Sequence, residues 1–147
     1  MTYRSLTSTR VAQIVDYFEA LRPSDLERLD QFYSADAWFK DPFNEVIGVA
    51  AIRLIFEHMF KQLDEPRFVI TKVFESTDSA VLVWEFHFRM RRFDRRNQCI
   101  RGCSHLSFDA SQRMRRHRDY WDAAEELYEK LPVLGGLMRW LKRRANA

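Results

Sequence analysis

The sequence predicts an α+β domain in which a cone-shaped, curved antiparallel sheet and three N-terminal helices enclose a pocket. Apolar residues recur at helical spacing in three segments before residue 63, and at a spacing of two in four segments from residue 67 to 121. Helices segregated from a run of strands pack on one face of an antiparallel sheet. With 147 residues the chain suits one domain. We expect residues 1–122 to form it and residues 123–147 to be an amphipathic helical extension.

The three helices are predicted from apolar stripes and caps. Residues 9–21 carry apolar side chains at helical spacing, with Thr9 as the expected N-cap. Ser24 and Glu27 form a capping box for a second helix, whose apolar stripe continues to Tyr33. The third helix covers residues 49–62 and follows Gly48. Between the second and third helices, residues 37–42 are expected to form an extended segment that Pro42 interrupts.

Four strands follow as a meander, expected at residues 67–76, 80–90, 99–108 and 113–121. One face of the second strand is wholly apolar and includes Trp84 and Phe86, whereas the opposite face carries Glu85 and His87. The outer face, with Val73, Val81 and Val83, is an expected homodimer interface. The tail continues as a helix from Ala123 to residue 131 and as a basic amphipathic segment at 133–144, which favours packing on its own domain or a partner over a membrane surface.

Composition excludes several function classes. Hydrophobic residues make up 46% and charged residues 31% of the chain, which excludes a disordered protein, and no segment reaches the length of a membrane span. The N-terminus carries no apolar signal segment, and Cys99 and Cys103 would lie about 13 Å apart on a strand, too far to bridge. We therefore expect free thiols and a cytoplasmic protein. Only 4 glycines occur and none forms a phosphate-binding loop, so we expect no cofactor.

The net charge of +3 is concentrated in a basic block at residues 89–118. Such a block raises nucleic-acid binding as a hypothesis, but no helix-turn-helix, zinc-finger or RNA-recognition motif accompanies it. A solvated sheet face and hairpin explain it better, and we expect no nucleic-acid partner.

The order of elements, the stretch Tyr33-Ser34-Ala35-Asp36-Ala37, the Asp41-Pro42 step and Gly48 before a third helix resemble the nuclear transport factor 2-like superfamily. The similarity is greatest to its SnoaL-like, ketosteroid isomerase-like branch and covers residues 11–121. It implies a cone-shaped fold around a pocket for a small hydrophobic molecule. Ketosteroid isomerase uses an aspartate base with a tyrosine and a protonated aspartic acid as oxyanion donors.

The resemblance assigns candidate roles by position. Asp41 matches the base, Tyr17 matches the tyrosine, and Ser104 stands where the isomerase has its protonated aspartic acid, which departs from the steroid isomerase pattern. Trp121 falls in the pocket. Strand alternation from Trp121 then brings His117 and Asp119 to the same inward face, where a carboxylate would orient the imidazole for acid–base chemistry. The candidate catalytic residues are therefore Asp41, His117, Asp119 and Tyr17.

Each candidate also has a structural interpretation. Asp41 commonly accepts backbone N–H bonds in a turn before proline, His117 and Asp119 suit an ion pair at a sheet edge, and the Tyr17 hydroxyl suits a backbone carbonyl. Aromatic side chains are expected to line the pocket and to select a flat, apolar, oxygenated ligand. These lining residues, with Ser104 and Trp121, are Trp38, Phe56, Phe60, Trp84 and Phe86.

Two functions remain open at this point. The first is cofactor-free acid–base catalysis of the isomerase, dehydratase, cyclase or epoxide hydrolase type. The alternative is a non-catalytic module that binds a hydrophobic ligand or dimerises, because fold alone does not fix function. His58, His87 and His105 are expected on outer faces, and without HxxxH or HxH spacing we expect no metal site.

Overall fold

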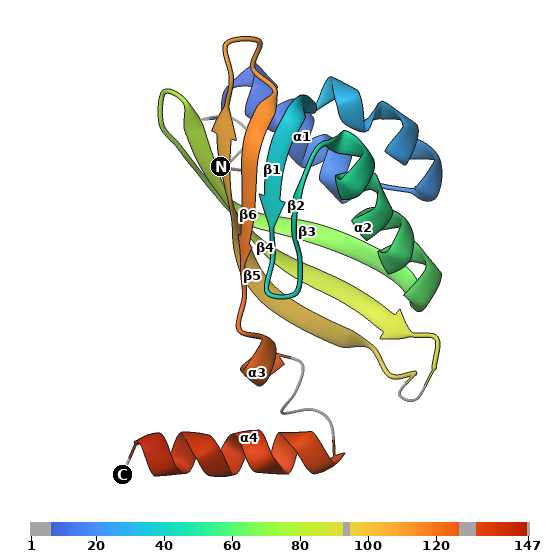
Figure 1. The fold of residues 1–147 in the computed structure, drawn as a ribbon, viewed down its shortest axis with the longest axis vertical. Helices are drawn as coiled ribbons and strands as arrows, with labels where there is room; N and C mark the ends of the chain where they lie inside the picture. The colour runs from blue at the N-terminus through green and yellow to red at the C-terminus, as the bar shows by residue number, and fades with distance from the viewer. Residues whose placement is uncertain (1–6, 93–94, 127–131, 147) are drawn as a thin grey trace.

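The computed structural model describes residues 7–92, 95–126 and 132–146 and contains one curved six-stranded sheet (Figure 1). The strand order is β2-β1-β6-β5-β4-β3. The strands are β1 (Tyr33–Lys40), β2 (Glu45–Ile47), β3 (Leu63–Glu75), β4 (Ser79–Met90), β5 (Gln98–Phe108) and β6 (Met114–Tyr120). The helices are α1 (Thr9–Glu19), the 3-10 helix η2 (Pro23–Gln31), α2 (Val49–Gln62), α3 (Ala123–Glu126) and α4 (Pro132–Ala145). The α+β fold class predicted from the sequence is confirmed.

The predicted meander of four strands corresponds to β3–β6, but β1 and β2 extend the sheet beyond it. We expected only an extended piece at residues 37–42, and Tyr33 was assigned to the preceding helix. Instead β1 begins at Tyr33 and pairs with β6 in parallel, with Phe39 opposite His117. The sheet is therefore mixed, with one parallel pairing among antiparallel ones.

Local chemistry sets the helix starts, and it differs from the expected caps at two of them. The side chain of Ser8, not Thr9, accepts the N–H of Val11 and caps α1. At η2 the Asp25 carboxylate accepts the N–H of Arg22 at 2.8 Å, which replaces the expected capping box at Ser24. Gly48 precedes α2 with a φ of 99°, a conformation that side chains with a Cβ rarely adopt.

The core lies between the helices and the inner face of the sheet, as Figure 1 shows for α1 and α2. The β4 alternation is as expected, since Leu82 and Trp84 are buried. On β6, both Met114 and His117 are buried because the register with β5 shifts between Ser107 and Phe108. This irregularity is a β-bulge that re-aims one side chain inward.

A second bulge, in β3, corrects the predicted outer face. The register between β3 and β4 shifts between Ile70 and Lys72, so Val73 pairs with Leu82 and packs against the core. Phe74 takes its place on the outer face, where it pairs with Val81 and is 52% exposed.

The C-terminal segment forms two helices. Glu126 ends the described part of α3, so the expected helix to residue 131 lies partly outside the described residues. Pro132 is the first residue of α4, a position that suits a residue without an N–H donor. Leu137, Trp140 and Leu141 on α4 are half exposed. No described helix has the length and apolar character that crossing a membrane requires. The division at residues 1–122 and 123–147 stays a prediction.

Candidate functional site

Five polar side chains form one hydrogen-bonded chain on the inner face of the sheet. The Tyr33 hydroxyl lies 2.6 Å from His117 Nδ1, and His117 Nε2 lies 2.6 Å from Asp119 Oδ1. The Ser104 hydroxyl donates to the same Asp119 Oδ1 at 2.5 Å, and the Trp84 indole N–H donates to Ser104 Oγ at 2.8 Å. The structure therefore brings three of the predicted site residues, Ser104, His117 and Asp119, into direct contact.

Strand register places these side chains together. Ser104 on β5 lies opposite Asp119 on β6, and the parallel pairing of β1 sets Phe39 beside His117. The Trp84 indole crosses over Gly102, because a Cβ on that glycine would lie 2.7 Å from Trp84 Cη2. A glycine is therefore required here by close approach rather than by its backbone angles.

Hydrogen-bond balance assigns the protons in this chain. Tyr33 is fully buried, and burial together with the negative Asp119 raises its pKa well above the usual range, so it remains a neutral donor. It donates to Nδ1 of His117, which therefore carries its proton on Nε2 and donates to Asp119. The donors from both sides thus converge on Asp119 Oδ1, which is the terminal acceptor.

His117 and Asp119 differ in their access to solvent. The His117 side chain is 5% exposed and both of its nitrogens are occupied, whereas the Asp119 side chain is 18% exposed. We expected Asp119 to orient His117 for acid–base chemistry, and the exposures of the two side chains indicate the reverse arrangement. Asp119 is therefore the more accessible group of the pair, and His117 contacts it from the buried side.

The enclosed space beside this chain is small. It measures about 30 Å³, the volume of about one water molecule. Ligand pockets measure about 300–1,000 Å³, so side chains fill the interior where we expected a pocket. The wall consists of Phe18, Phe56, Phe68, Ile70, Leu82, Trp84, Ser104, His117 and Asp119.

A larger groove opens to solvent on the other side of Asp119. Its volume is about 580 Å³. It is lined by Lys40, Asp41, Pro42, Arg118, Asp119, Tyr120, Trp121 and Asp122. Asp119 lines both spaces, so the buried hydrogen-bonded chain ends where the interior meets the groove.

Asp41 lies in the groove but is used by its own turn. Its Oδ1 accepts the backbone N–H groups of Phe43 and Asn44 at 2.8 and 2.6 Å, and the Asn44 amide bonds both carboxylate oxygens. These are the contacts of the structural interpretation given above.

Tyr17 is also engaged elsewhere. Its hydroxyl donates to the Asp25 carbonyl at 2.7 Å, and its ring stacks on Phe32. Burial and the nearby Asp25 charge raise the pKa of Tyr17 to about 12. Neither space beside Asp119 includes Tyr17 in its wall.

The aromatic residues expected to bind substrate divide into four groups, the last of which is Trp38 alone. Phe56 and Trp84 line the enclosed space, whereas Phe60 and Phe86 pack on the core beside it. Trp121 follows the last strand and lies in the groove, edge-on to Phe43.

Trp38 is the clearest misplacement among these aromatic residues. Alternation along β1 buries Ala37 and Phe39, so Trp38 faces outward, where Arg116 lies 4.2 Å above its ring and Glu45 accepts its N–H.

Sequence reasoning missed Tyr33, Phe18, Phe39 and Phe68. Phe39 meets the His117 ring edge-on at 4.7 Å, and Tyr33 is parallel to it. Tyr33 lies an even number of residues from Ala37 and Phe39 and is buried with them, but its segment also fitted the apolar stripe of the preceding helix. The signal that could have found Tyr33 was this spacing of two, which assigns it to the same face as Ala37 and Phe39.

The basic block is partly neutralised by ion pairs. Arg91 and Arg95 both contact Asp64, and Arg101 contacts Glu85. These contacts agree with a solvated sheet edge and hairpin, the interpretation preferred over nucleic-acid binding.

The family model of the SnoaL-like domain matches residues 14–117. The chain therefore belongs to the SnoaL-like domain family, and the resemblance drawn from the sequence is confirmed. No sequence among the curated proteins matches this chain.

Solved structures show the same fold. TsrD from Streptomyces laurentii gives a TM-score of 0.72 at 16% identity, over 86% of this chain and 98% of its own. A protein with a ketosteroid isomerase-like fold from Catenulispora acidiphila DSM 44928, in complex with trimethylamine, gives a TM-score of 0.69 at 15% identity, over 82% of this chain and 91% of its own. TerC, co-crystallized with polyporic acid, gives a TM-score of 0.68 at 16% identity, over 80% of this chain and 95% of its own. At these identities the similarity establishes the fold.

Proposed function

We propose that this protein is a cofactor-free acid–base enzyme that acts on a small, flat, oxygenated molecule bound in the groove beside Asp119. The observation that carries the proposal is the buried chain Tyr33–His117–Asp119–Ser104, which ends on a partly exposed carboxylate. Burying the three polar side chains Tyr33, His117 and Ser104 carries a desolvation penalty that an apolar core would not. A hydrogen-bonded cluster of titratable groups of this kind beside a cleft is typical of a reactive site.

Asp119 acts as the base in this scheme. Both bonds that it accepts end on Oδ1, which directs Oδ2 to the substrate. A carbon–hydrogen bond next to a carbonyl breaks, the proton moves to Asp119, and the electron pair forms a carbon–carbon double bond as the carbonyl oxygen becomes an enolate. Where the substrate has a carbon–carbon double bond next to the deprotonated carbon, the intermediate is a dienolate. Asp119 then returns the proton to the far carbon of that bond, the double bond shifts by one position and the carbonyl re-forms, which completes an isomerisation.

The groove supplies the rest of the site. Tyr120 and Trp121 offer flat aromatic surfaces, and Arg118 and Lys40 place positive charge near a developing enolate oxygen. His117 and Tyr33 are positioning residues that act through Asp119. The complexes of TerC with polyporic acid and of the Catenulispora protein with trimethylamine support a small-molecule ligand for this fold.

A second function, binding without catalysis, is favoured by a different observation. Every buried side-chain N or O atom of the described residues already has a partner, so the polar chain is satisfied without a substrate. In that case the groove binds a ligand and the polar chain only stabilises the fold.

We also propose a cytoplasmic homodimer, formed through the outer sheet face at Phe74, Val81 and Val83, where Phe74 is 52% exposed.

Proton exchange tests the two functions against each other. A panel of planar ketones is incubated in D₂O with the protein, and deuterium incorporation next to the carbonyl is followed by NMR. The enzyme proposal expects exchange above the buffer rate, reduced about 100-fold or more in Asp119→Asn. Asp41→Asn is the comparison, because the family resemblance points to Asp41 as the base and the structure to Asp119.

Two outcomes contradict the enzyme proposal. The first is exchange by the wild-type protein no faster than buffer across ketones that bind. The second is an Asp119→Asn variant that exchanges as fast as wild type, and full loss in Asp41→Asn alone would return the role to Asp41. Circular dichroism spectra of both variants check that the fold is retained.

A further inference from the structure

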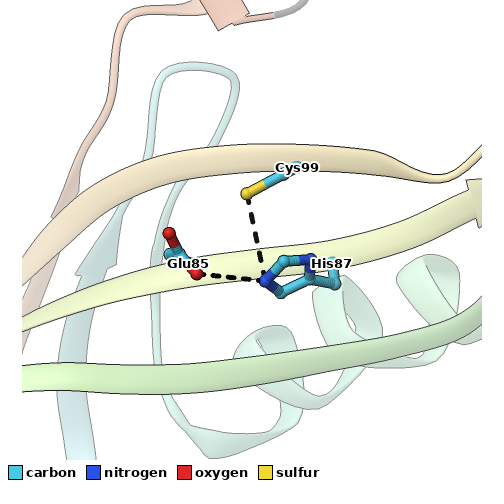
Figure 2. A group of neighbouring side chains, drawn as sticks. All are labelled: Glu85, His87 and Cys99. Carbon is cyan, nitrogen blue, oxygen red and sulfur yellow. Dashed lines mark hydrogen bonds and ion pairs between the residues drawn. The ribbon is translucent and has the colours of Figure 1, made fainter.

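The outer face of the sheet carries a cluster of three metal-ligating side chains, Glu85, His87 and Cys99, which we name the β4–β5 cluster (Figure 2). One donor atom from each residue lies within 4.8 Å of the others. His87 Nε2 is 3.2 Å from Glu85 Oε1 and 4.0 Å from Cys99 Sγ. All three side chains are half-buried, so the backbone and neighbours restrict them while solvent still reaches them.

Regular strand geometry holds the cluster together. Glu85 and His87 are two residues apart on β4 and face outward, because Trp84 before them and Phe86 between them pack on the core side of the sheet. Cys99 on β5 lies directly opposite His87 in the antiparallel register. Directly opposed residues have Cβ atoms about 4.5–5.5 Å apart, so the donors originate from fixed backbone positions rather than from a loop.

We propose that the β4–β5 cluster binds one divalent ion of the zinc class, through Glu85 Oε1, His87 Nε2 and Cys99 Sγ, with water in the fourth position. A carboxylate, an imidazole and a thiolate are the three ligand types that Zn²⁺ takes in proteins. Tetrahedral bonds of about 2.0–2.3 Å place ligand atoms about 3.3–3.6 Å apart. The carboxylate and imidazole are already at 3.2 Å, and the sulfur, 4.0 Å from the imidazole nitrogen, must approach that nitrogen by about 0.5 Å.

Two arginines that neighbour the cluster do not occupy the donor atoms that the ion would use. Arg101 Nε lies 3.6 Å from Glu85 Oε2, the oxygen that does not face His87. Arg67 on β3 lies opposite His87 and is exposed to solvent. With Cys99 as a thiolate and Glu85 as a carboxylate, two negative charges neutralise the ion. The thiol gives up its proton on binding, so one proton is released per metal bound.

The cluster is independent of the proposed acid–base site. Glu85 and His87 face the side of the sheet opposite to Trp84, which belongs to the chain that ends at Asp119. A metal here connects β4 to β5 and presents an open coordination position on the outer face. The metal proposal can therefore be tested independently of the enzyme proposal.

Titration of the full chain with Co²⁺ tests the site. A thiolate ligand produces a sulfur-to-cobalt charge-transfer absorption in the near ultraviolet, and a tetrahedral site produces strong visible bands. We expect both at one equivalent, with the signal lost when Zn²⁺ displaces the cobalt. Cys99→Ser should abolish the charge-transfer band and weaken Zn²⁺ binding by more than the 10–100-fold effect of an outer-shell partner.

Cys103→Ser is the matched control, because Cys103 lies four residues further along β5 and outside the cluster. It should bind cobalt as the wild type does, and so should Asp119→Asn. Calorimetry in buffers of different ionisation enthalpy should report one released proton, and none in Cys99→Ser. A wild-type protein without the charge-transfer band, or a band that survives Cys99→Ser, overturns the proposal.

Discussion

Replacing Tyr33 with phenylalanine removes a single hydroxyl from the buried end of the polar chain. The ring stays parallel to His117, but Nδ1 of His117 loses the donor that lies 2.6 Å away. Because Tyr33 is fully buried, no solvent replaces that donor. A buried acceptor left without a partner costs about 1–3 kcal/mol of unfolding free energy. For a chain of this length that loss lowers Tm by about 3–10 °C.

Two measurements check the Tyr33→Phe prediction. Thermal and urea unfolding followed by circular dichroism give the stability change. The ¹⁵N shifts of His117 should show the proton on Nε2 in the wild type, and Nδ1 should shift toward the value of an unbonded imidazole nitrogen in the variant. Tyr17→Phe is the control, because it also removes a tyrosine hydroxyl but leaves the His117 shifts unchanged.

The proton assignment is refuted by either of two results. One is a wild-type spectrum with the His117 proton on Nδ1, since Tyr33 would then have no role as donor. The other is a Tyr33→Phe stability equal to wild type within about 0.5 kcal/mol, a difference typical of surface substitutions away from such features.

Three further predictions concern other parts of the molecule. In an alkaline titration Tyr17 and Tyr33 should ionise last. The pKa of Tyr17 is raised to about 12 and that of Tyr33 well above its usual range, so the stability that the two groups contribute is present below about pH 10 and is lost as the pH rises above it. Tyrosinate absorbance that appears with a single midpoint near pH 10 in the folded protein would contradict this. Gly102→Ala should destabilise by about 1–3 kcal/mol because its Cβ would lie 2.8 Å from the Tyr120 carbonyl oxygen, whereas Gly136→Ala, with open space around it, should not; equal Tm values for the two variants would contradict the close approach. Phe74→Glu should convert the proposed dimer to a monomer by light scattering, and a control on the exposed Leu54 should not; a wild-type protein that is already monomeric removes the dimer proposal.

The sequence predicted the parts of the fold that depend on regular alternation. β4 has an unbroken spacing of two, and Trp84 faces inward and Glu85 outward as expected. The errors elsewhere have two causes. The bulge in β3, which sequence spacing does not reveal, moved Val73 into the core, and Tyr33 was missed because the start of β1 also fitted the end of a helix.

The candidate site was predictable to a similar extent. His117 and Asp119 were found because they are two residues apart on a strand, and Ser104 came from the family resemblance. Their order of access to solvent was not predictable, because it depends on Tyr33 occupying Nδ1 from a strand far away in the sequence. Asp41 and Tyr17 formed local contacts within eight residues of themselves, which compete with any role in a pocket.

The parallel pairing of β1 with β6 has a consequence for folding kinetics. Tyr33 and His117 are separated by 84 residues, and every element from β2 to β5 lies between them in the chain. Contacts of such long range form slowly, because the chain must first close a large loop. During synthesis α1, η2, α2 and the β3–β5 meander emerge before β6, so they can pair while the polar chain is still incomplete. The contact between Tyr33 and His117 is therefore a reporter of late folding, and the rate at which it forms measures the docking of the last strand.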